Sequence, residues 1–411
     1  MKRSPAAAEP DATAAGRRAE WRLRVYPIAI LVTLALALGF WVIAAANSDA
    51  PGETAGGDYP AFYGAGRIAA ADDWDELYTL ERQTQAQEDL YSDGGNVARF
   101  FAYPPQVAAI YRPLASLDYH WSYLVHTTLM VLLLWGAVLI ARPMIPWLRG
   151  RVTVALAGAL LFWPMFRAVT GGSNTALTLF LIVAAWRLIH EDQLFVAGLA
   201  VAGLAYKPQF AVPLVGLFLL GRYWRVVGGA IVGSSIFYLW GVWLQGWGWG
   251  AEWLEVAADF GAIDAEINGH SSISFIGFAE NLFGVGMSPG VAVAWVLAGA
   301  TVLLLSWLWW RGTRPDLPYL LAITMPGVLL LSLHAMSHDG AVVVLTAAVG
   351  VAAWERRDWV PWVAVIWLLG ASQLLIKQLG FSPGFPMLLI VLLWAWLIPQ
   401  RREITDSEPL P

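Results

Sequence analysis

The sequence has no cysteine and few charged residues. Of its 411 residues, only 13% are Asp, Glu, Lys or Arg, and 6 are His. Without cysteine, a disulfide framework, thiol catalysis and cysteine-ligated metals are excluded, so stability must come from helix packing. The low charge, the 58% hydrophobic content and a mean hydropathy of +0.58 exclude a soluble globular protein. The composition therefore predicts an all-α polytopic membrane protein.

Apolar runs recur along the chain, and several approach the roughly 20 residues that a bilayer-crossing helix needs. A Lys-Pro pair in "AYKPQ" charges and kinks one stretch, which is either two short spans or one bent, re-entrant element. We expect about twelve transmembrane helices in all, over residues 27–46, 121–141, 152–166, 175–189, 194–206, 208–220, 226–244, 291–310, 319–333, 341–354, 361–375 and 384–398.

The distribution of arginine predicts the orientation. Arginines lie before the first span, in alternate short connections and after the last span, which places both termini on the cytoplasmic side of the plasma membrane. We expect a disordered cytoplasmic tail over 1–26, a transmembrane domain over 27–399 and a cytoplasmic tail over 400–411. A cleaved signal peptide ending near "IAAAN" is the alternative for the first span, which we interpret as a retained helix.

Nearly all of the chemically interesting residues then fall on the outer side, in two long loops (47–120 and 246–290) and several short ones. Irregular polar backbone at membrane depth is tolerated where it lines a cavity or meets water, so the extracytoplasmic face is the expected working face. In the first loop, Ile68, Trp74, Leu77 and Tyr78 alternate with charged residues, which predicts amphipathic helices on the membrane surface. Phe100, Phe101 and Tyr103 are expected to dip into the interface.

Five segments occur in an order that is typical of one family. They are Asp58-Tyr59 directly after the first span, "ELY", "FAYPPQVAAIYRPLASL", "GGSNTALTLFLIVAAWR" and "AGLAVAGLAYKPQFAVPLV". In these segments, which cover most of residues 58–350, the chain resembles the membrane glycosyltransferases of family 87. That family belongs to the C-type glycosyltransferase (GT-C) fold and includes polyprenyl-phosphate-mannose-dependent mannosyltransferases.

The resemblance implies a hexosyltransferase, mannosyl above all, with its active site on the outer face. It would invert the anomeric centre, with a polyprenyl-phosphate-linked sugar from the bilayer as donor and a glycolipid or glycan as acceptor. Asp58 is similar in position to the family's general base, and a positioned base contributes about 10²- to 10⁴-fold. The glycines at 56, 57, 64 and 66 would let backbone approach the substrate. The alternative is that Asp58 is a solvated loop residue, like the acidic residues just after it.

A departing polyprenyl phosphate needs preorganised cations. Lys207 is the first choice, because a lysine in an apolar run needs an anionic partner, and its alternative is snorkelling to headgroups. Arg67 and Arg99 are further choices. We expect the donor site to include Tyr59, Tyr103 and Asn174 as well, although Asn174 is also placed to cap the following helix.

The segment "LHAMSHDG" holds His334 and His338, four residues apart. The family has a histidine or an aromatic residue before Asp at the place of His338, more often as Tyr-Asp, so by resemblance His338 contacts the sugar or the donor phosphate. His334 is expected in the same donor site; alternatively, both histidines bind helix-end carbonyls. With no third ligand at a characteristic spacing, we expect neither a metal nor another cofactor. His270 and Asn268 are expected acceptor contacts.

No nucleic-acid-binding module occurs in the sequence, so no nucleic-acid partner is expected. A transporter or flippase of lipid-linked saccharides is the alternative function, with Asp58 and Lys207 as a gating pair. The long aromatic first loop favours the enzyme, since a transporter does not require it.

Overall fold

The computed structural model describes residues 12–46, 56–90, 99–313, 316–354 and 358–407. All regular elements in these residues are helical, and one isolated β-bridge joins Ser272 and Met336. The predicted all-α class is therefore confirmed.

Five helical segments of the described residues are long and apolar enough to cross a membrane. One of these segments consists of three consecutive short helices, α17, η9 and α18. Helices α6 and α7 meet at an angle of 82° and would form a sixth segment if they are counted as one broken or re-entrant span. These elements are α1 (Ala12–Ala46), α5 (Tyr119–Ala141), α11 (Trp224–Gln245), α14 (Pro289–Arg311), α17 (Val360–Ser372) with η9 (Gln373–Leu375) and α18 (Ile376–Leu379), α6 (Val152–Leu161) and α7 (Trp163–Thr170).

The other expected spans are apolar helices of 10–17 residues. A helix lies at each of the twelve expected places, but the number of about twelve spans is not confirmed, because half of these helices are short. They are α8 (Thr175–His190), α9 (Leu194–Ala202) with η5 (Gly203–Tyr206), α10 (Pro208–Leu220), α15 (Leu317–Leu331), η8 (Asp339–Val343) with α16 (Val344–Ala353), and the first part of α19 (Gly384–Ser407). The "AYKPQ" stretch forms two short helical segments, one on each side of Lys207.

The ends of the chain contain more helix than we expected. Helix α1 begins at Ala12, so residues 12–26 of the expected disordered tail are helical. Helix α19 continues to Ser407 and includes most of the expected C-terminal tail. Residues 1–11 and 408–411 lie outside the described part.

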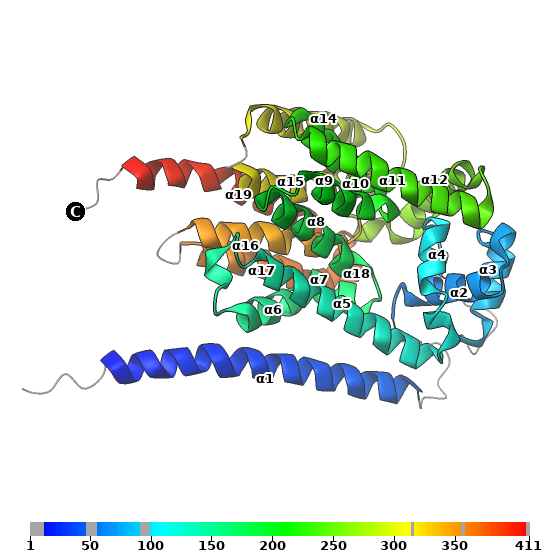
Figure 1. Cartoon of the computed structure of the whole chain (residues 1–411), viewed down its shortest axis with the longest axis horizontal. Coiled ribbons are helices and arrows are strands. Elements are labelled where there is room, and N and C mark those ends of the chain that lie inside the picture. The colour runs from blue at the N-terminus through cyan, green and yellow to red at the C-terminus, as the bar shows by residue number, and fades with distance from the viewer. Residues whose placement is uncertain (1–11, 47–55, 91–98, 314–315, 355–357, 408–411) are drawn as a thin grey trace, which may run out of the picture.

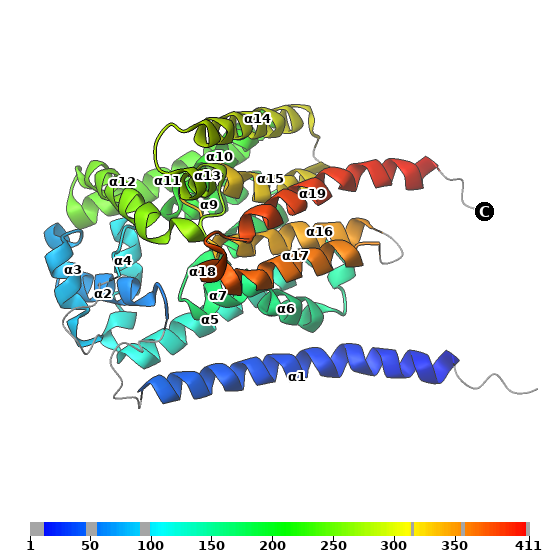
Figure 2. The same cartoon turned by 180° about the vertical axis from the view of Figure 1, so that it is seen from behind.

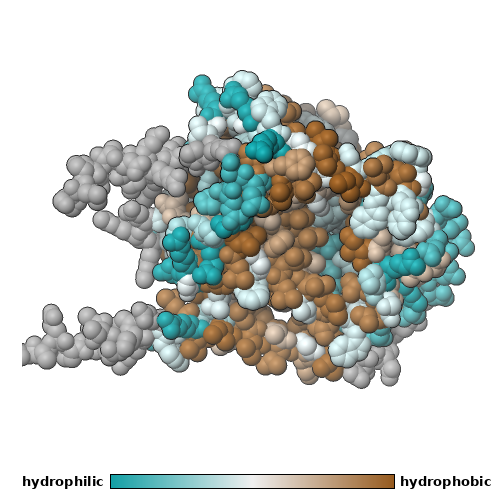
Figure 3. All heavy atoms as spheres, in the orientation of Figure 1, coloured by the Kyte–Doolittle hydropathy of each residue, from teal (hydrophilic) through white to brown (hydrophobic). Residues whose placement is uncertain are grey.

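The long helices lie side by side along the longest axis of the molecule (Figures 1 and 2). The N-terminal end of α1 and the C-terminal end of α19 lie at one end, and the elements of the first long loop lie at the other. Hydrophobic side chains cover the middle of the surface, with hydrophilic ones gathered towards both ends (Figure 3). This arrangement fits a membrane protein, and the helical layer at the end with the first long loop is called the outer layer below.

The first long loop folds into this layer, and one prediction about it is wrong. The apolar residues Ile68, Leu77 and Tyr78, which we expected to face the membrane, are instead buried together in a second hydrophobic cluster. Phe101 is fully buried there too, instead of dipping into the interface. The elements are α2 (Tyr59–Ala70), η1 (Trp74–Glu76), α3 (Leu80–Ala86), η2 (Glu88–Leu90), α4 (Pro105–Tyr111) and η3 (Leu114–Ser116).

The second long loop contains a long helix with exposed apolar residues. Helix α12 exposes Leu254, Ile263 and Ile267 while packing near the first loop. The remaining elements are η4 (Pro146–Leu148), α12 (Trp249–Asn268), η6 (Gly269–Ser271) and α13 (Phe275–Phe283).

Candidate active site

Asp58 occupies the N-cap position of α2, at the boundary between the helical bundle and the outer layer. Its backbone N–H donates to the carbonyl of Gly171, with an N···O distance of 2.7 Å. Its side chain makes no capping hydrogen bond and is 52% exposed. The backbone is thus fixed, while the carboxylate stays accessible.

Close backbone packing holds Asp58 in place. Gly172 has a φ of +74°, and a side-chain carbon there would lie 2.5 Å from Cβ of Tyr59. We expected four glycines to face the substrate. At three of them an added side-chain carbon would collide with protein atoms: at Gly56 with Tyr123, at Gly64 with Gln87 and at Gly66 with Tyr111. Of the four, only Gly57 has ordinary space around it. The other glycines therefore serve packing, which corrects their predicted role.

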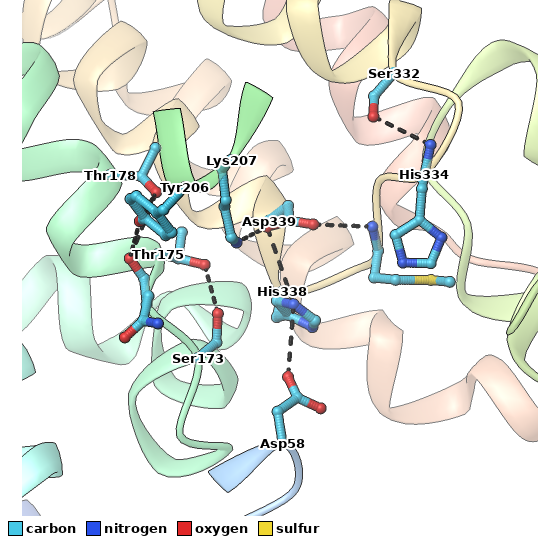
Figure 4. A network of polar contacts seen from close by, with 12 residues as sticks. Asp58, Ser173, Thr175, Thr178, Tyr206, Lys207, Ser332, His334, His338 and Asp339 are labelled. Atoms are coloured by element: carbon cyan, nitrogen blue, oxygen red, sulfur yellow. Dashed lines mark hydrogen bonds and ion pairs between the residues drawn. The ribbon is translucent and has the colours of Figure 1, made fainter. Parts of the chain in front are cut away.

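The carboxylate of Asp58 faces a polar network from the segment between α15 and α16 (Figure 4). Nε2 of His338 lies 3.8 Å from Oδ2 of Asp58 and 3.9 Å from Oδ1 of Asp339. The imidazole is one-quarter exposed and lies between an accessible carboxylate and a buried one. His338 contacts carboxylates, so the alternative that it merely binds helix-end carbonyls does not describe it.

Asp339 in turn holds Lys207. The Nζ and Oδ1 atoms are 2.9 Å apart, and the side chains are 3% and 5% exposed. The second oxygen of Asp339 accepts the backbone N–H of Met336. Burial by itself would lower the pKa of Lys207, but the facing carboxylate, with Tyr103 and Tyr206 nearby, raises that pKa above its usual value. Lys207 therefore does not snorkel to headgroups, and it already has an anionic partner.

The other histidine of this segment lies in a neighbouring cluster. Nε2 of His334 is 3.6 Å from Oδ2 of Asp264, and the other oxygen of Asp264 accepts a hydrogen bond from the Asn268 amide. The ring of His334 also meets Phe260 edge-on. These contacts join α12 to the segment that carries His338. His270 follows in η6 and is partly exposed.

Two predicted donor-site residues, Tyr59 and Asn174, are held by buried hydrogen bonds, and the third, Tyr103, lies near Lys207, Asp339 and Asp58. Tyr59 is fully buried, and its hydroxyl lies 2.6 Å from that of Ser122. Asn174 occupies the N-cap position of α8 without a side-chain capping bond, and its side-chain oxygen accepts from the hydroxyl of Tyr111 at 2.8 Å. The ring of Tyr103 stacks on Tyr206, at an interplanar angle of 20°. Residue type and order in the sequence suggested these three residues, but the partners of their polar side-chain atoms are known only from the fold.

Arg67 and Arg99 lie in the outer layer. The Arg67 guanidinium donates to the carboxylate of Asp89 at 2.5 Å and to the carbonyl of Ala86. The backbone of Arg99 is bound by the Gln87 side chain, and its own side chain is exposed. Neither side chain is brought to Asp58 by a described contact.

Sequence reasoning missed two partners. Asp264 was not singled out, and Asp339 was seen beside His338 without being connected to Lys207, from which it is separated by 132 positions. An unpartnered lysine in an apolar run was the available signal for the second partner. The isolated Lys207 indicated that an anionic partner was needed, but the sequence did not indicate that the partner is Asp339.

Comparison with known proteins identifies the chain. Residues 101–337, more than half of the sequence, match the model of glycosyltransferase family 87. The chain belongs to this family. No curated protein matches this family 87 chain. The matched range includes Lys207 and Asn174. His338 and Asp339 directly follow its end, whereas Asp58 lies well before its start.

Family membership and the apolar helices together make the chain a membrane glycosyltransferase, which needs a sugar donor and an acceptor. In the described residues, no group of three His, Asp or Glu side chains is arranged to hold a metal ion. The site offers one accessible carboxylate, an imidazole beside it and a buried ion pair behind them.

Proposed function

We propose that this family 87 chain is an inverting hexosyltransferase, mannosyl in the first instance. It takes the sugar from a polyprenyl-phosphate donor and delivers it to a hydroxyl of a glycolipid or glycan on the extracytoplasmic face of the plasma membrane. The observation that carries the proposal is the half-exposed carboxylate of Asp58, directed at His338 in a membrane glycosyltransferase.

Asp58 acts as the general base. The acceptor hydroxyl attacks C1 of the sugar, its oxygen forms the new bond to C1, and its proton passes to the carboxylate. The bond from C1 to the phosphate oxygen breaks, and polyprenyl phosphate leaves with the electron pair. Asp339 is unsuited to the same task, because it is buried against Lys207. A single accessible carboxylate favours one displacement, hence inversion at C1.

His338 orients the base. Its ring lies 3.8 Å from Asp58, longer than a hydrogen bond, and catalytic contacts of this kind tighten when substrate binds. Asp339 and Lys207 hold the segment that carries this ring. The acceptor lies against α12 and η6, where Asn268 and His270 belong to the exposed outer layer.

The test is sugar transfer by the purified full-length protein in liposomes, from radiolabelled polyprenyl-phosphate-mannose to a membrane glycolipid extract. We expect Asp58→Asn to lower the rate by about 10²- to 10⁴-fold while donor binding persists. Asp75→Asn is the matched control, because Asp75 is an exposed carboxylate in the same layer. NMR of the product should show the anomer opposite to that of the donor.

Equal transfer by wild type and Asp58→Asn would remove Asp58 from the chemistry. Absence of transfer from every lipid-phosphate-linked sugar, together with movement of such lipids between the leaflets of a liposome, would favour the transporter.

A further inference from the structure

The departing lipid phosphate needs a cation. Of the three expected cations, Arg99 is brought to Asp58 by no described contact, and the other two are already paired. Lys207 is buried against Asp339, and Arg67 binds Asp89 and a backbone carbonyl. Bringing either to a phosphate requires breaking an ion pair. A different cation should therefore face the space beside Asp58.

Arg167 has that position. It lies on α7, the short helix that is bent by 82° against α6, and its side chain is exposed. Its guanidinium lies beside the residue before the base, since a side-chain carbon on Gly57 would be 3.8 Å from Nη2 of Arg167. Two backbone hydrogen bonds connect the two regions: Gly171 N–H donates to the carbonyl of Arg167, and Asp58 N–H donates to the carbonyl of Gly171, each at 2.7 Å.

The guanidinium of Arg167 has an unused binding capacity. Among the described residues, it makes no hydrogen bond or ion pair, not even with Asp58. A guanidinium presents several N–H donors in a planar fork that matches two phosphate oxygens. Gly57 has no side chain to block the approach from that side. An unpaired arginine next to Gly57, the residue before the proposed base, is suited to an anion that arrives with the substrate.

We propose that Arg167 binds the phosphate of the lipid-linked donor and stabilises the charge on its leaving oxygen. This inference rests on the proposed function for the identity of the lipid. Asp58 and Arg167 then act on the two sides of the same displacement at C1. The carboxylate takes the proton of the attacking acceptor hydroxyl, and the guanidinium binds the departing phosphate.

Binding tests the inference without requiring transfer. Undecaprenyl phosphate and undecaprenol are titrated into the purified full-length chain in detergent, and intrinsic tryptophan fluorescence is followed. Wild type should prefer the phosphate form. Arg167→Gln should weaken its binding by about 10- to 100-fold, the range expected for hydrogen bonds to a charged group, and leave undecaprenol unaffected. Arg167→Lys should retain part of the preference, because it keeps the charge but loses the fork.

The control is Arg112→Gln, an exposed arginine at the end of α4 that is paired with Asp72. It should bind as wild type does. Wild-type affinity in Arg167→Gln would overturn the proposal. Equal displacement of undecaprenyl phosphate by phosphatidylglycerol would overturn it as well, since Arg167 would then hold general lipid headgroups.

Kinetics separates this inference from the proposed function. If wild type transfers sugar, Arg167→Gln should raise KM for the donor and lower kcat, because the phosphate is held both before and during its departure. Normal kinetics in Arg167→Gln would reject the role of Arg167 and leave the proposed function standing. A wild-type protein that binds the lipid phosphate through Arg167 but transfers no sugar would reject the proposed function alone.

Discussion

Lys207 and Asp339 form a buried ion pair, with 2.9 Å between Nζ and Oδ1, that joins the start of α10 to the segment carrying His338. The two residues belong to parts of the chain that are 132 positions apart. The pair therefore fixes the position of the segment that carries His338 relative to the start of α10. Removal of one charge leaves the other buried without a partner, which is costly.

The first prediction concerns the stability of this pair. Lys207→Met should destabilise the protein by about 3–5 kcal/mol, because an uncompensated carboxylate stays buried. Lys207→Met combined with Asp339→Leu should be more stable than Lys207→Met alone. Thermal unfolding of the purified protein in detergent measures both. Equal stability of the single and double variants would show that the two charges do not interact.

The second prediction concerns His338 as a positioning residue. His338→Ala removes the ring beside Asp58 and should lower kcat by about 10²-fold, the effect of a small misplacement of a catalytic group. KM for the donor should change little, because Arg167 rather than His338 is assigned to the phosphate. Steady-state kinetics gives the two constants separately. An increase in KM at constant kcat would make His338 a donor contact instead.

The outer layer shows how far sequence pattern reaches. Hydropathy located a helix at each expected span, and the residue type and setting of Asp58 singled it out as the candidate base. Pattern could not tell that Tyr59 and Asn174 face inward, because polar residues suit a site and a buried hydrogen bond equally. Likewise, alternating apolar residues such as Ile68 indicate a buried face without showing what covers it.

Arg167 is a residue that the sequence pattern did not select. In the sequence it is one arginine among many, next to a glycine-rich turn. Its position beside Gly57 depends on the bend between α6 and α7 and on the hydrogen bond from Asp58 to Gly171. These contacts connect segments more than a hundred residues apart, which periodicity does not report.

A third prediction follows from the backbone that supports Asp58. Gly172→Ala should reduce both stability and transfer, since a positive φ costs other residues about 1–2 kcal/mol and the new carbon would push Tyr59 away. The shift would move Asp58, the residue before it. Gly216→Ala on α10 is the control, because nothing lies within 4 Å of the added carbon. Thermal unfolding and transfer rate should both be normal in the control; normal values for Gly172→Ala would contradict the geometry.

The last prediction tests the orientation, and the absence of cysteine makes it direct. Gln85 is exposed on α3 in the layer that contains Asp58, whereas Gln193 is exposed in the turn after α8. Helix α8 starts beside Asn174 and is 16 residues long, so its far end lies about 24 Å away. If the site faces outward, a membrane-impermeant maleimide should label Gln85→Cys in intact cells. It should label Gln193→Cys only after permeabilisation. The wild type, with no thiol, is the blank, and transfer activity shows that each variant is folded. The reverse labelling pattern would place the site on the cytoplasmic face, where a donor in the outer leaflet could not reach Asp58.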